Sequence, residues 1–293
     1  MKKGLTILLI AIFAILLTTT FIACDKEVEI PAGTNISIMS YNIRQNTATD
    51  SGTHAWSYRK SYLVEHIKEQ APTILCMQEV KKGQYQYIQE QTAETYDVIW
   101  YSRTVDESQE GLAIAYDKSK LELISQDMFW LSNTPDTESK GFGAPFLRIC
   151  VHAILKEIET EREISVYCVH LEVASESARK KEIQMIIDRV KADERETIVC
   201  GDFNTTKESE CYTSISEIMS STQDTAINTE YGITYQDFGG KSITFDSSID
   251  FIFTTSGFFA KDFSILDEHK EIDGKSVYYS DHYAVKADVV FKN

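Results

Sequence analysis

Six apolar stretches of the sequence carry, at one end, side chains that can bind a hard cation or transfer a proton. In chain order these side chains are Asn42, Glu79, His170, Asp202 with Asn204, Asp250, and Asp281 with His282. Each has a structural explanation when taken alone, because Asn and Asp commonly close turns at strand ends. Their joint occurrence indicates one polar site of carboxylates, amides and imidazoles, which suits acid–base chemistry beside a metal ion.

Three motifs within this set are the most specific: Gln78-Glu79, Gly201-Asp202-Phe203-Asn204 and Ser280-Asp281-His282. On these motifs, residues 36–291 resemble the endonuclease/exonuclease/phosphatase superfamily. That superfamily includes pancreatic-type deoxyribonucleases, abasic-site endonucleases, inositol polyphosphate 5-phosphatases and neutral sphingomyelinases. Stretches 109–111 and 129–132 look like those of an uncharacterised bacterial branch. The resemblance implies an α/β fold, a four-layered sandwich of two mixed β-sheets packed face to face and flanked by helices.

The resemblance also implies a reaction, the hydrolysis of a phosphodiester or phosphomonoester by in-line attack of water. This reaction needs a hard cation on the phosphoryl oxygens, a base for the water and an acid for the leaving oxygen. Glu79 is then the main ligand of Mg²⁺ or Mn²⁺, and Asp281 is a second carboxylate ligand. Asn42 either supplies an amide oxygen or orients a carboxylate beside it. Zinc is not expected, because His and Cys are too few in the cluster.

By the same resemblance, His282 is the general base and Asp250 is its orienting partner. A carboxylate on the far ring nitrogen fixes the tautomer of an imidazole and raises its basicity. Asp202 would hold the attacking water or bind metal. Asn204 would donate a hydrogen bond to a phosphoryl oxygen.

His170 corresponds to the second His of the superfamily, which contacts phosphate or helps to protonate the leaving group, and Glu110 is its expected partner. One position departs from the pattern. Many members carry Asn two positions before this His, whereas this chain has Cys168. A thiol cannot replace an amide that both donates and accepts hydrogen bonds well. We interpret Cys168 as a buried strand residue and not as a nucleophile, because no flanking group lowers its pKa.

Arginine side chains are candidates for holding the substrate phosphate, since guanidinium groups bind phosphate in a bidentate manner. Arg148 precedes a predicted strand and matches a recurrent Arg of the superfamily, and Arg103 follows another strand. Arg44 follows Asn42 but also fits a solvated position. Trp56 and Tyr58 could stack on a substrate ring, although packing of a helix explains them as well.

Short β-rich runs that alternate with a few helical segments would position these residues. The clearest helix covers 175–191, where Ile183, Ile186, Ile187 and Val190 recur with helical spacing opposite a charged face. Helices are also predicted over 56–69 and 208–219. Residues 220–247 are polar and irregular and are expected to form a surface excursion. Strands are predicted over 36–43, 73–78, 96–101, 111–116, 121–130, 148–156, 164–171, 197–200, 248–254 and 284–291.

The N-terminal residues predict export. Residues 1–23 have a basic start and an apolar run, which is the layout of a signal peptide. Ala23-Cys24 resembles a bacterial lipobox, so Cys24 is the expected lipidation site, although Phe21 departs from the usual small aliphatic residue. A plain secretory signal and an uncleaved anchor are the alternatives. Residues 24–35 would be a tether, 36–293 the folded domain, and the cell envelope, on its periplasmic or outer-membrane face, the location.

Composition narrows the class of protein further. A hydrophobic content of 43% with only 13 Gly and 4 Pro excludes a disordered or collagen-like chain. The net charge of −16 at pH 7 repels polyanions and argues against non-specific coating of nucleic acid. The five cysteines after Cys24 form no C-x-x-C pattern, so we expect buried thiols, with a single disulfide as the alternative. We expect a monomer.

Four functions are compatible with these residues. A small phosphodiester or phosphomonoester is the first choice of substrate, followed by nucleic acid with a metal-dependent nuclease activity. A sphingomyelinase-like lipid phosphodiesterase is third, and it would need an exposed aromatic tip, for which Phe258-Phe259 is the candidate. The alternative from another class is a non-catalytic surface binding protein on the same fold. The completeness of the polar set favours an enzyme.

Overall fold

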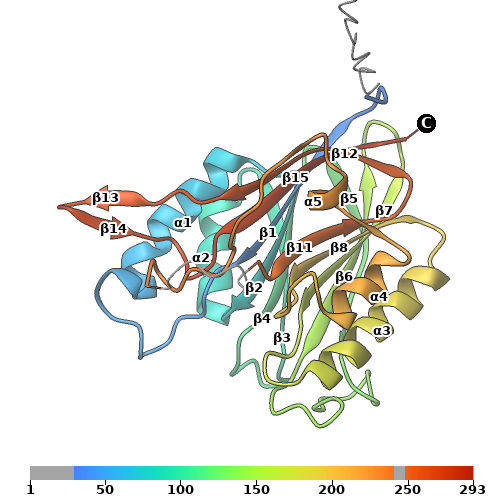
Figure 1. Ribbon diagram of the computed structural model, residues 1–293. Helices are drawn as coiled ribbons and strands as arrows, with labels where there is room; N and C mark the ends of the chain where they lie inside the picture. The colour runs from blue at the N-terminus through green and yellow to red at the C-terminus, as the bar shows by residue number, and fades with distance from the viewer. Residues whose placement is uncertain (1–29, 241–247, 293) are drawn as a thin grey trace, which may run out of the picture.

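Two large β-sheets packed against each other form the centre of the molecule in the computed structural model, which describes residues 30–240 and 248–292. Helices cover the outer faces of both sheets, and Figure 1 shows α1 and α2 on one side and α3 and α4 on the other. The predicted four-layered sandwich of two mixed sheets is therefore confirmed. No helix of the described residues is long and apolar enough to span a bilayer.

The first sheet has seven strands. Its β1 is parallel to β2 and antiparallel to β15, so the sheet is mixed. In spatial order the strands are β10 (Asn228–Thr229), β12 (Phe258–Leu266), β15 (Ala284–Phe291), β1 (Asn35–Asn42), β2 (Ile74–Val80), β4 (Gly111–Asp117) and β3 (Tyr96–Ser102).

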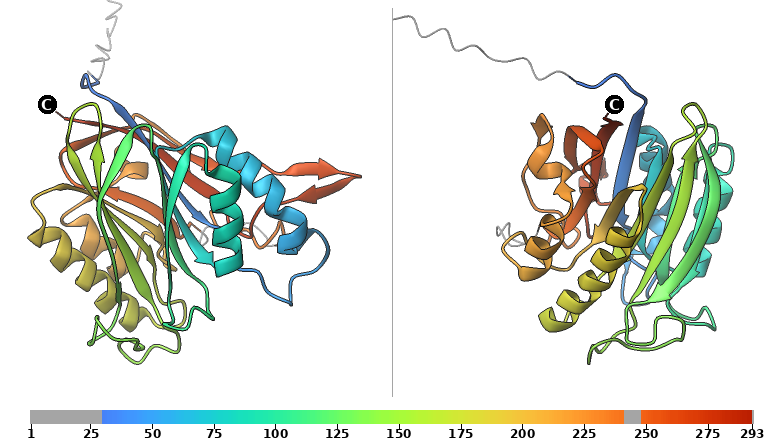
Figure 2. Two further views of the ribbon diagram at one scale, coloured as in Figure 1. Left: turned by 180° about the vertical axis from the view of Figure 1, so that it is seen from behind. Right: turned by 90° about the vertical axis from the view of Figure 1, so that its right-hand side faces the viewer.

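The second sheet has six strands, and it is also mixed because β7 and β8 run parallel while their other neighbours are antiparallel. In spatial order the strands are β5 (Leu121–Trp130), β6 (Ile149–Glu157), β7 (Glu163–His170), β8 (Glu196–Asp202), β11 (Asp250–Thr254) and β9 (Ser220–Ser221). A separate hairpin of β13 (Lys270–Ile272) and β14 (Lys275–Val277) projects from the body, as Figures 1 and 2 show.

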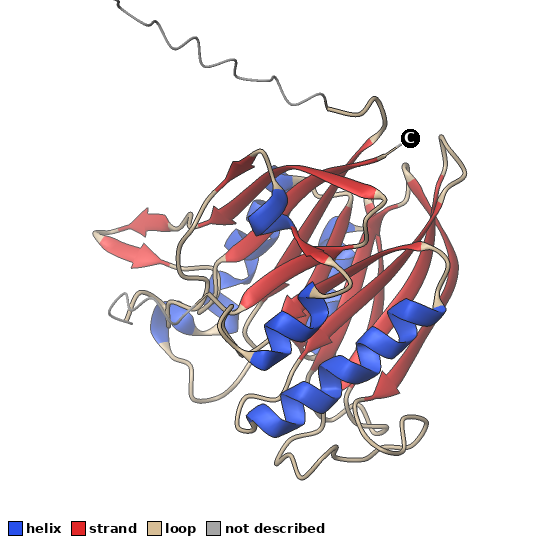
Figure 3. Cartoon of the chain, turned by 45° about the vertical axis from the view of Figure 1, so that its right-hand side comes forward, coloured by secondary structure: helices blue, strands red, loops and turns tan. Residues whose placement is uncertain are grey.

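The two longest helices, α1 and α3, each bury one apolar face. Within α3 (Glu176–Ala192), the predicted apolar positions Ile183, Ile186 and Ile187 are buried, and the Ser175 side chain caps the helix by accepting a hydrogen bond from the Ala178 N–H. The blue helices of Figure 3 lie outside the red strands accordingly. The other helical segments are η1 (Gly52–His54), α1 (Trp56–Gln70), α2 (Lys82–Thr92), α4 (Glu210–Ser216) and α5 (Thr222–Thr225).

Strand periodicity explains how the layers hold together. Along β1, Ile36 and Ile38 point into the core between the two sheets, whereas Met39 and Tyr41 point toward the core beneath α1 and α2. Successive side chains of a strand alternate between faces, so one apolar strand supplies both cores. Burial of these side chains from water is the main favourable contribution to folding.

The five cysteines of the described residues are buried free thiols, which agrees with the sequence interpretation. Cys76, Cys168 and Cys200 lie in the core between the sheets. Gln78 donates to the Cys168 sulfur at 3.5 Å, so this thiol fills a core position beside the site.

The structure differs from the sequence predictions in three respects. Helix α2 and strand β12 were not predicted. Phe258 is not an exposed tip, because it lies within β12 and is buried in the core between the sheets. The segment after residue 220 is more than a surface excursion, since Thr222, Thr234 and Gln236 are fully or almost fully buried. Residues 241–247 lie outside the described residues, as do residues 1–29 with Cys24.

Candidate active site

The predicted site residues meet at one edge of the two sheets because of the strand directions. Strands β1, β2, β7 and β8 end at this edge, while the antiparallel strands β4, β6, β11 and β15 begin there. Within the second sheet the register places Asp202 opposite both His170 and Asp250. Side chains from stretches far apart in the chain therefore converge, as the sequence predicted.

Asp202 lies at the centre of the site. Its Oδ2 accepts a hydrogen bond from the Asn42 amide at 3.0 Å and lies 3.4 Å from His170 Nε2 and 3.8 Å from His282 Nε2. Asp250 Oδ2 lies 2.9 Å from His282 Nδ1, which is the predicted pairing. His282 thus has a carboxylate next to each ring nitrogen, and all of these groups are buried.

Glu79 and Asp281 line the same pocket. The Asn42 amide donates to Glu79 Oε1 at 3.3 Å as well as to Asp202, while its own oxygen accepts from the Arg44 N–H. Asn42 therefore orients two carboxylates, which is the second of the two roles expected for it. The Arg44 guanidinium is not simply solvated, because it pairs with Asp50 at 3.1 Å and lies 3.5 Å from Asp281.

The pairing expected between Glu110 and His170 is absent from the contacts of the described residues. Glu110 pairs instead with Arg103 at 2.5 Å, and His170 Nδ1 is buried without a hydrogen-bond partner. Ser102, just before Arg103, is the register partner of Gly111, just after Glu110. Adjacent strands therefore place these two side chains together.

Arg148 differs from the other arginines of the pocket. Arg103 donates to Gln109 and pairs with Glu110, and Arg44 is paired with Asp50. Among the described residues, the carboxylate nearest to Arg148 belongs to Glu172, and it lies 3.9 Å from Nε. Arg148 therefore keeps more of its donor capacity for a substrate anion.

Asn204 is held by the backbone around it. Its amide donates to the Leu171 carbonyl at 2.9 Å, and its N–H donates to Asp202 at 2.8 Å. One amide hydrogen is thus used within the protein, and the side chain still lines the pocket. Both Asn204 and Glu79 have positive φ, 50° and 62°, a backbone strain that is concentrated at functional sites.

Gly201 allows β8 to approach β7 beside the site. Its φ is +155°, and a Cβ at this position would lie 1.9 Å from the Val169 carbonyl oxygen. A side chain here would push the two strands apart. Glycine in the Gly-Asp-Phe-Asn motif is therefore required for the contact between Asp202 and His170.

The two imidazoles differ in proton affinity. Burial opposes a charge on His282, but the charge and hydrogen bond of Asp250 and the charge of Asp202 outweigh it and raise the His282 pKa to about 10. Burial, followed by the charges of Arg148 and His282, holds the pKa of His170 well below its ordinary value. Environments that separate two proton affinities in this way are typical of an acid–base pair.

The carboxyl groups of the site are perturbed as well. Burial raises the pKa of Glu110 to about 7, and burial together with the charge of Asp250 raises that of Asp202 to about 7. The pKa of Asp281 is raised by burial and further by the charge of Glu79. Negative charge is thus concentrated where a cation would relieve it, and oxygen donors of this kind suit a hard divalent ion.

A second set of candidate ligands lies deeper. Asp202, Asp250 and His282 each offer an atom, and these atoms lie within 4.8 Å of one another. However, Asp250 and His282 already satisfy each other through the 2.9 Å hydrogen bond. Glu79 and Asp281, which line the pocket, offer carboxylate oxygens alone, the ligand type that Mg²⁺ and Mn²⁺ prefer.

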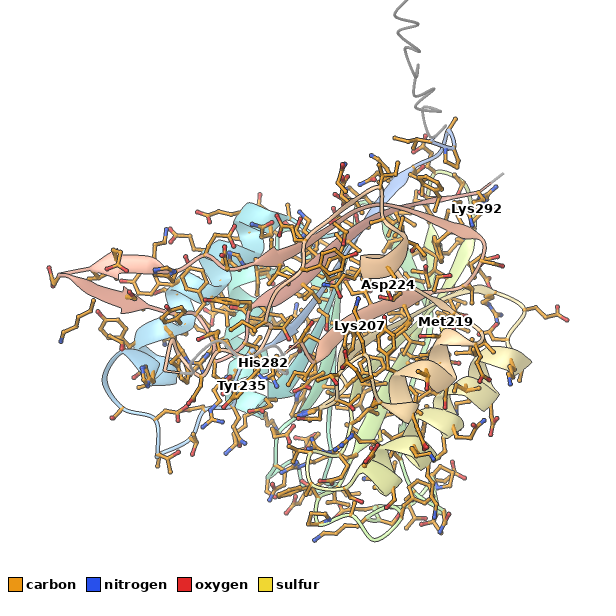
Figure 4. The ribbon with its side chains drawn as sticks, in the orientation of Figure 1. Lys207, Met219, Asp224, Tyr235, His282 and Lys292 are labelled. Atoms are coloured by element: carbon orange, nitrogen blue, oxygen red, sulfur yellow. The ribbon has the colours of Figure 1, made fainter. Side chains whose placement is uncertain are left out.

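The pocket above these groups has a volume of about 520 Å³. Five of its lining residues were not foreseen from the sequence: Gln45, Phe146, Val173, Tyr235 and Ile249. Tyr235 and His282 lie side by side in Figure 4, with ring centroids 5.0 Å apart. Phe146 and Tyr235 belong to irregular segments without periodicity, so the sequence carried no signal for them.

The family model described as the Endonuclease/Exonuclease/phosphatase family matches residues 39–282, and the chain belongs to this family. A Bacteroides vulgatus member of known structure is 30% identical, with a TM-score of 0.82 over 88% of this chain and 100% of that one. A mannosyl-6-phosphatase from Bacteroides thetaiotaomicron is 26% identical, with a TM-score of 0.81 over 87% of this chain and 100% of that one. The CCR4-Not 3'-5'-exoribonuclease subunit Ccr4 of Mycosarcoma maydis is 24% identical over 64% of this chain and 36% of its own length.

Proposed function

We propose that the protein is a divalent-metal-dependent phosphoesterase that hydrolyses a small phosphate ester by in-line attack of water. The observation that carries this proposal is the convergence of the Asp250–His282 pair, His170 and an available arginine on the pocket that also contains Glu79 and Asp281. The relative that is named a mannosyl-6-phosphatase supports a phosphomonoester as the substrate.

Glu79 and Asp281 are the residues that would hold the cation, with Asn42 orienting Glu79. Bound there, Mg²⁺ or Mn²⁺ would polarise a phosphoryl oxygen as a Lewis acid and lower the proton affinity of His282 from its metal-free value.

The protein's own groups would handle the protons and the phosphate. Asp250 fixes the His282 ring through Nδ1, which leaves Nε2, on the Asp202 side, to accept the proton of the attacking water. Arg148 would bind phosphoryl oxygens through its guanidinium edge, and Asn204 would donate its remaining amide hydrogen. His170 faces the pocket near Arg148 and would interact with the leaving oxygen.

The test is an assay of mannose 6-phosphate, bis-p-nitrophenyl phosphate and plasmid DNA with Mg²⁺, Mn²⁺ or EDTA. We expect hydrolysis of a small ester that EDTA abolishes, and a decrease of about 10²- to 10⁴-fold in kcat for His282→Ala, the range for loss of a proton-transfer group. Equal rates for wild type and variant that do not respond to EDTA would instead support a non-catalytic binding protein.

A metal-dependent nuclease is the second candidate, and the similarity to the Ccr4 exoribonuclease favours it. The net charge of −16 opposes it, since a nuclease surface normally attracts a polyanion. Cleavage of the plasmid with higher kcat/KM than either small ester would make this second function the correct one. The lipid phosphodiesterase loses its support with the burial of Phe258.

We also propose export to the cell envelope as a monomer tethered through lipidated Cys24. The support is the layout of residues 1–23 and the Ala23-Cys24 pair. Metabolic labelling with a radioactive fatty acid should mark the wild type and not Cys24→Ala. Labelling of neither protein would contradict the anchor.

A further inference from the structure

One wall of the active-site pocket is apolar and open to solvent. Phe146 is 42% exposed and Val173 is 52% exposed, and both line the pocket. Single exposed apolar side chains are common on protein surfaces, but these two stand together at the mouth of a polar catalytic pocket. They belong to the loops that precede β6 and follow β7, which also carry Arg148 and Glu172.

The position of Arg148 relates this wall to the phosphate. The Arg148 guanidinium carbon lies 5.8 Å from the centroid of the Phe146 ring. Glu172 is completely buried, and its Oε2 lies 3.9 Å from Arg148 Nε, so a carboxylate lies beside the guanidinium without a hydrogen bond between these two atoms. A phosphate bound to the outward edge of Arg148 would have the Phe146 ring directly beside it.

Charged and polar side chains also line the pocket. Glu79, Asp281 and Gln45 are among them, and the Arg44 guanidinium lies 3.5 Å from Asp281. The reacting phosphoryl group would lie near His282. Tyr235 and Ile249 also line the pocket, but Phe146 and Val173 are its most exposed apolar side chains and therefore offer the most accessible apolar surface to the organic part of the substrate.

We propose that Phe146 and Val173 bind the ring of the leaving alcohol and that the substrate is a pyranose phosphomonoester esterified on its exocyclic carbon. This inference rests on the proposed phosphoesterase function and deepens it. Aromatic side chains present a large flat surface, and the C–H bonds on one face of a pyranose complement it. The hydroxyl groups on the rim of the sugar remain available to the polar side chains of the pocket.

The short distance between Arg148 and Phe146 selects this class among phosphate esters. Only the ester oxygen and one carbon separate the phosphate from the ring of a sugar 6-phosphate, so the ring lies over Phe146. In a nucleoside 5'-phosphate the ribose intervenes, and the flat base would lie beyond this side chain. An acyclic polyol phosphate has no flat face to place there. The volume of about 520 Å³ also corresponds to a small ligand.

The experiment compares Phe146→Ala with wild type on three phosphomonoesters: mannose 6-phosphate, glycerol 3-phosphate and adenosine 5'-monophosphate. We expect the ratio of kcat/KM for mannose 6-phosphate to that for glycerol 3-phosphate to decrease about tenfold, as for loss of one aromatic contact. Phe146→Tyr should restore the wild-type ratio, because it keeps the ring.

Tyr58→Ala is the matched control, since Tyr58 is 40% exposed but lies on α1 and does not line the pocket. This variant should keep the wild-type ratio, and melting temperatures will show whether each variant is folded. An unchanged ratio in Phe146→Ala overturns the ring-binding assignment alone. A decrease confined to adenosine 5'-monophosphate overturns the sugar assignment. Failure of wild type to hydrolyse any of the three esters overturns this inference, and if bis-p-nitrophenyl phosphate also remains intact, it overturns the proposed function as well.

Discussion

His282 and His170 share one pocket, but their surroundings give them opposite proton affinities. His282 lies between the carboxylates of Asp250 and Asp202, whereas His170 is buried near Arg148 and has no partner for Nδ1. A ring that holds its proton tightly and a ring that remains neutral are thus produced from the same side chain type. The difference arises mainly from neighbours on other strands, with a smaller contribution to His282 from the adjacent Asp281.

The Asp250–His282 pair makes a prediction at the scale of single residues. Replacing Asp250 by Asn removes the charge that favours the protonated ring, so the His282 pKa should decrease from about 10 toward its ordinary value. The measurement is an NMR titration of the His ring protons in the metal-free protein. His66, whose pKa burial lowers to about 4, is the internal control and should not change. An unchanged His282 titration would show that Asp250 is not its partner.

At the scale of elements, α3 fixes the turn that follows His170. Glu182 accepts a hydrogen bond from the Glu172 N–H at 2.8 Å, and Arg179 donates to the Glu172 and Val173 carbonyls. Glu182 and Glu172 are completely buried, and each has one carboxylate oxygen without a partner among the described residues. The helix therefore holds the loop that carries both Val173 and Glu172.

Glu182 makes the stability of the protein depend on pH. Burial raises its pKa to about 7, so the folded state binds this proton more tightly than the unfolded state does. The stability that the folded state gains from the protonated Glu182 is fully present below a pH of about 4.5, and it is lost as pH rises through about 7. Glu182→Gln removes the titration but keeps an acceptor, so its stability relative to wild type should increase by up to about 3 kcal/mol between pH 5 and 8.

Urea unfolding of both proteins at the two pH values measures this difference. Gln184→Ala on the exposed face of the same helix is the control, because it removes no titrating group. A stability difference between Glu182→Gln and wild type that stays constant with pH would contradict the raised pKa of Glu182.

Regular elements with strong patterns could be predicted from the sequence, and elements with weak patterns could not. Helix α2 has Ile88 as its one buried apolar residue, beside Gln84 and Thr92, so no apolar face was visible. Strand β12 has an irregular register between Ala260 and Asp262, which breaks the alternation that reveals a strand. Both elements are specified by tertiary packing rather than by local periodicity.

The site was predictable to the extent that its residues end or begin strands. Asn42, Asp202 and Asp250 could be placed together, since the edge of a sheet collects strand ends. The partner of Glu110 could not, because the register of β3 and β4, which brings Arg103 to it, is a property of the folded sheet. Phe146 gave no signal because the loop before β6 has no periodic pattern.

At the scale of the whole molecule, the net charge of −16 gives a prediction about ionic strength. Raising the ionic strength from about 0.01 M to about 0.15 M shortens the Debye length from about 30 Å to about 8 Å. Any activity on an oligonucleotide should then increase, because repulsion between two polyanions is screened. Activity on a sugar phosphate should change much less. Initial rates across a salt series test this, and oligonucleotide cleavage that decreases with salt would indicate a basic binding track.

The hydrogen bond from Asn42 to Asp202 crosses from one sheet to the other. Neither sheet contains the complete site. The first sheet supplies Asn42 and Glu79, and the second supplies His170, Asp202 and Asp250. A shift of one sheet relative to the other would separate these side chains, and it would stop catalysis before either sheet unfolded. Turnover therefore depends on how well the two packed sheets remain aligned.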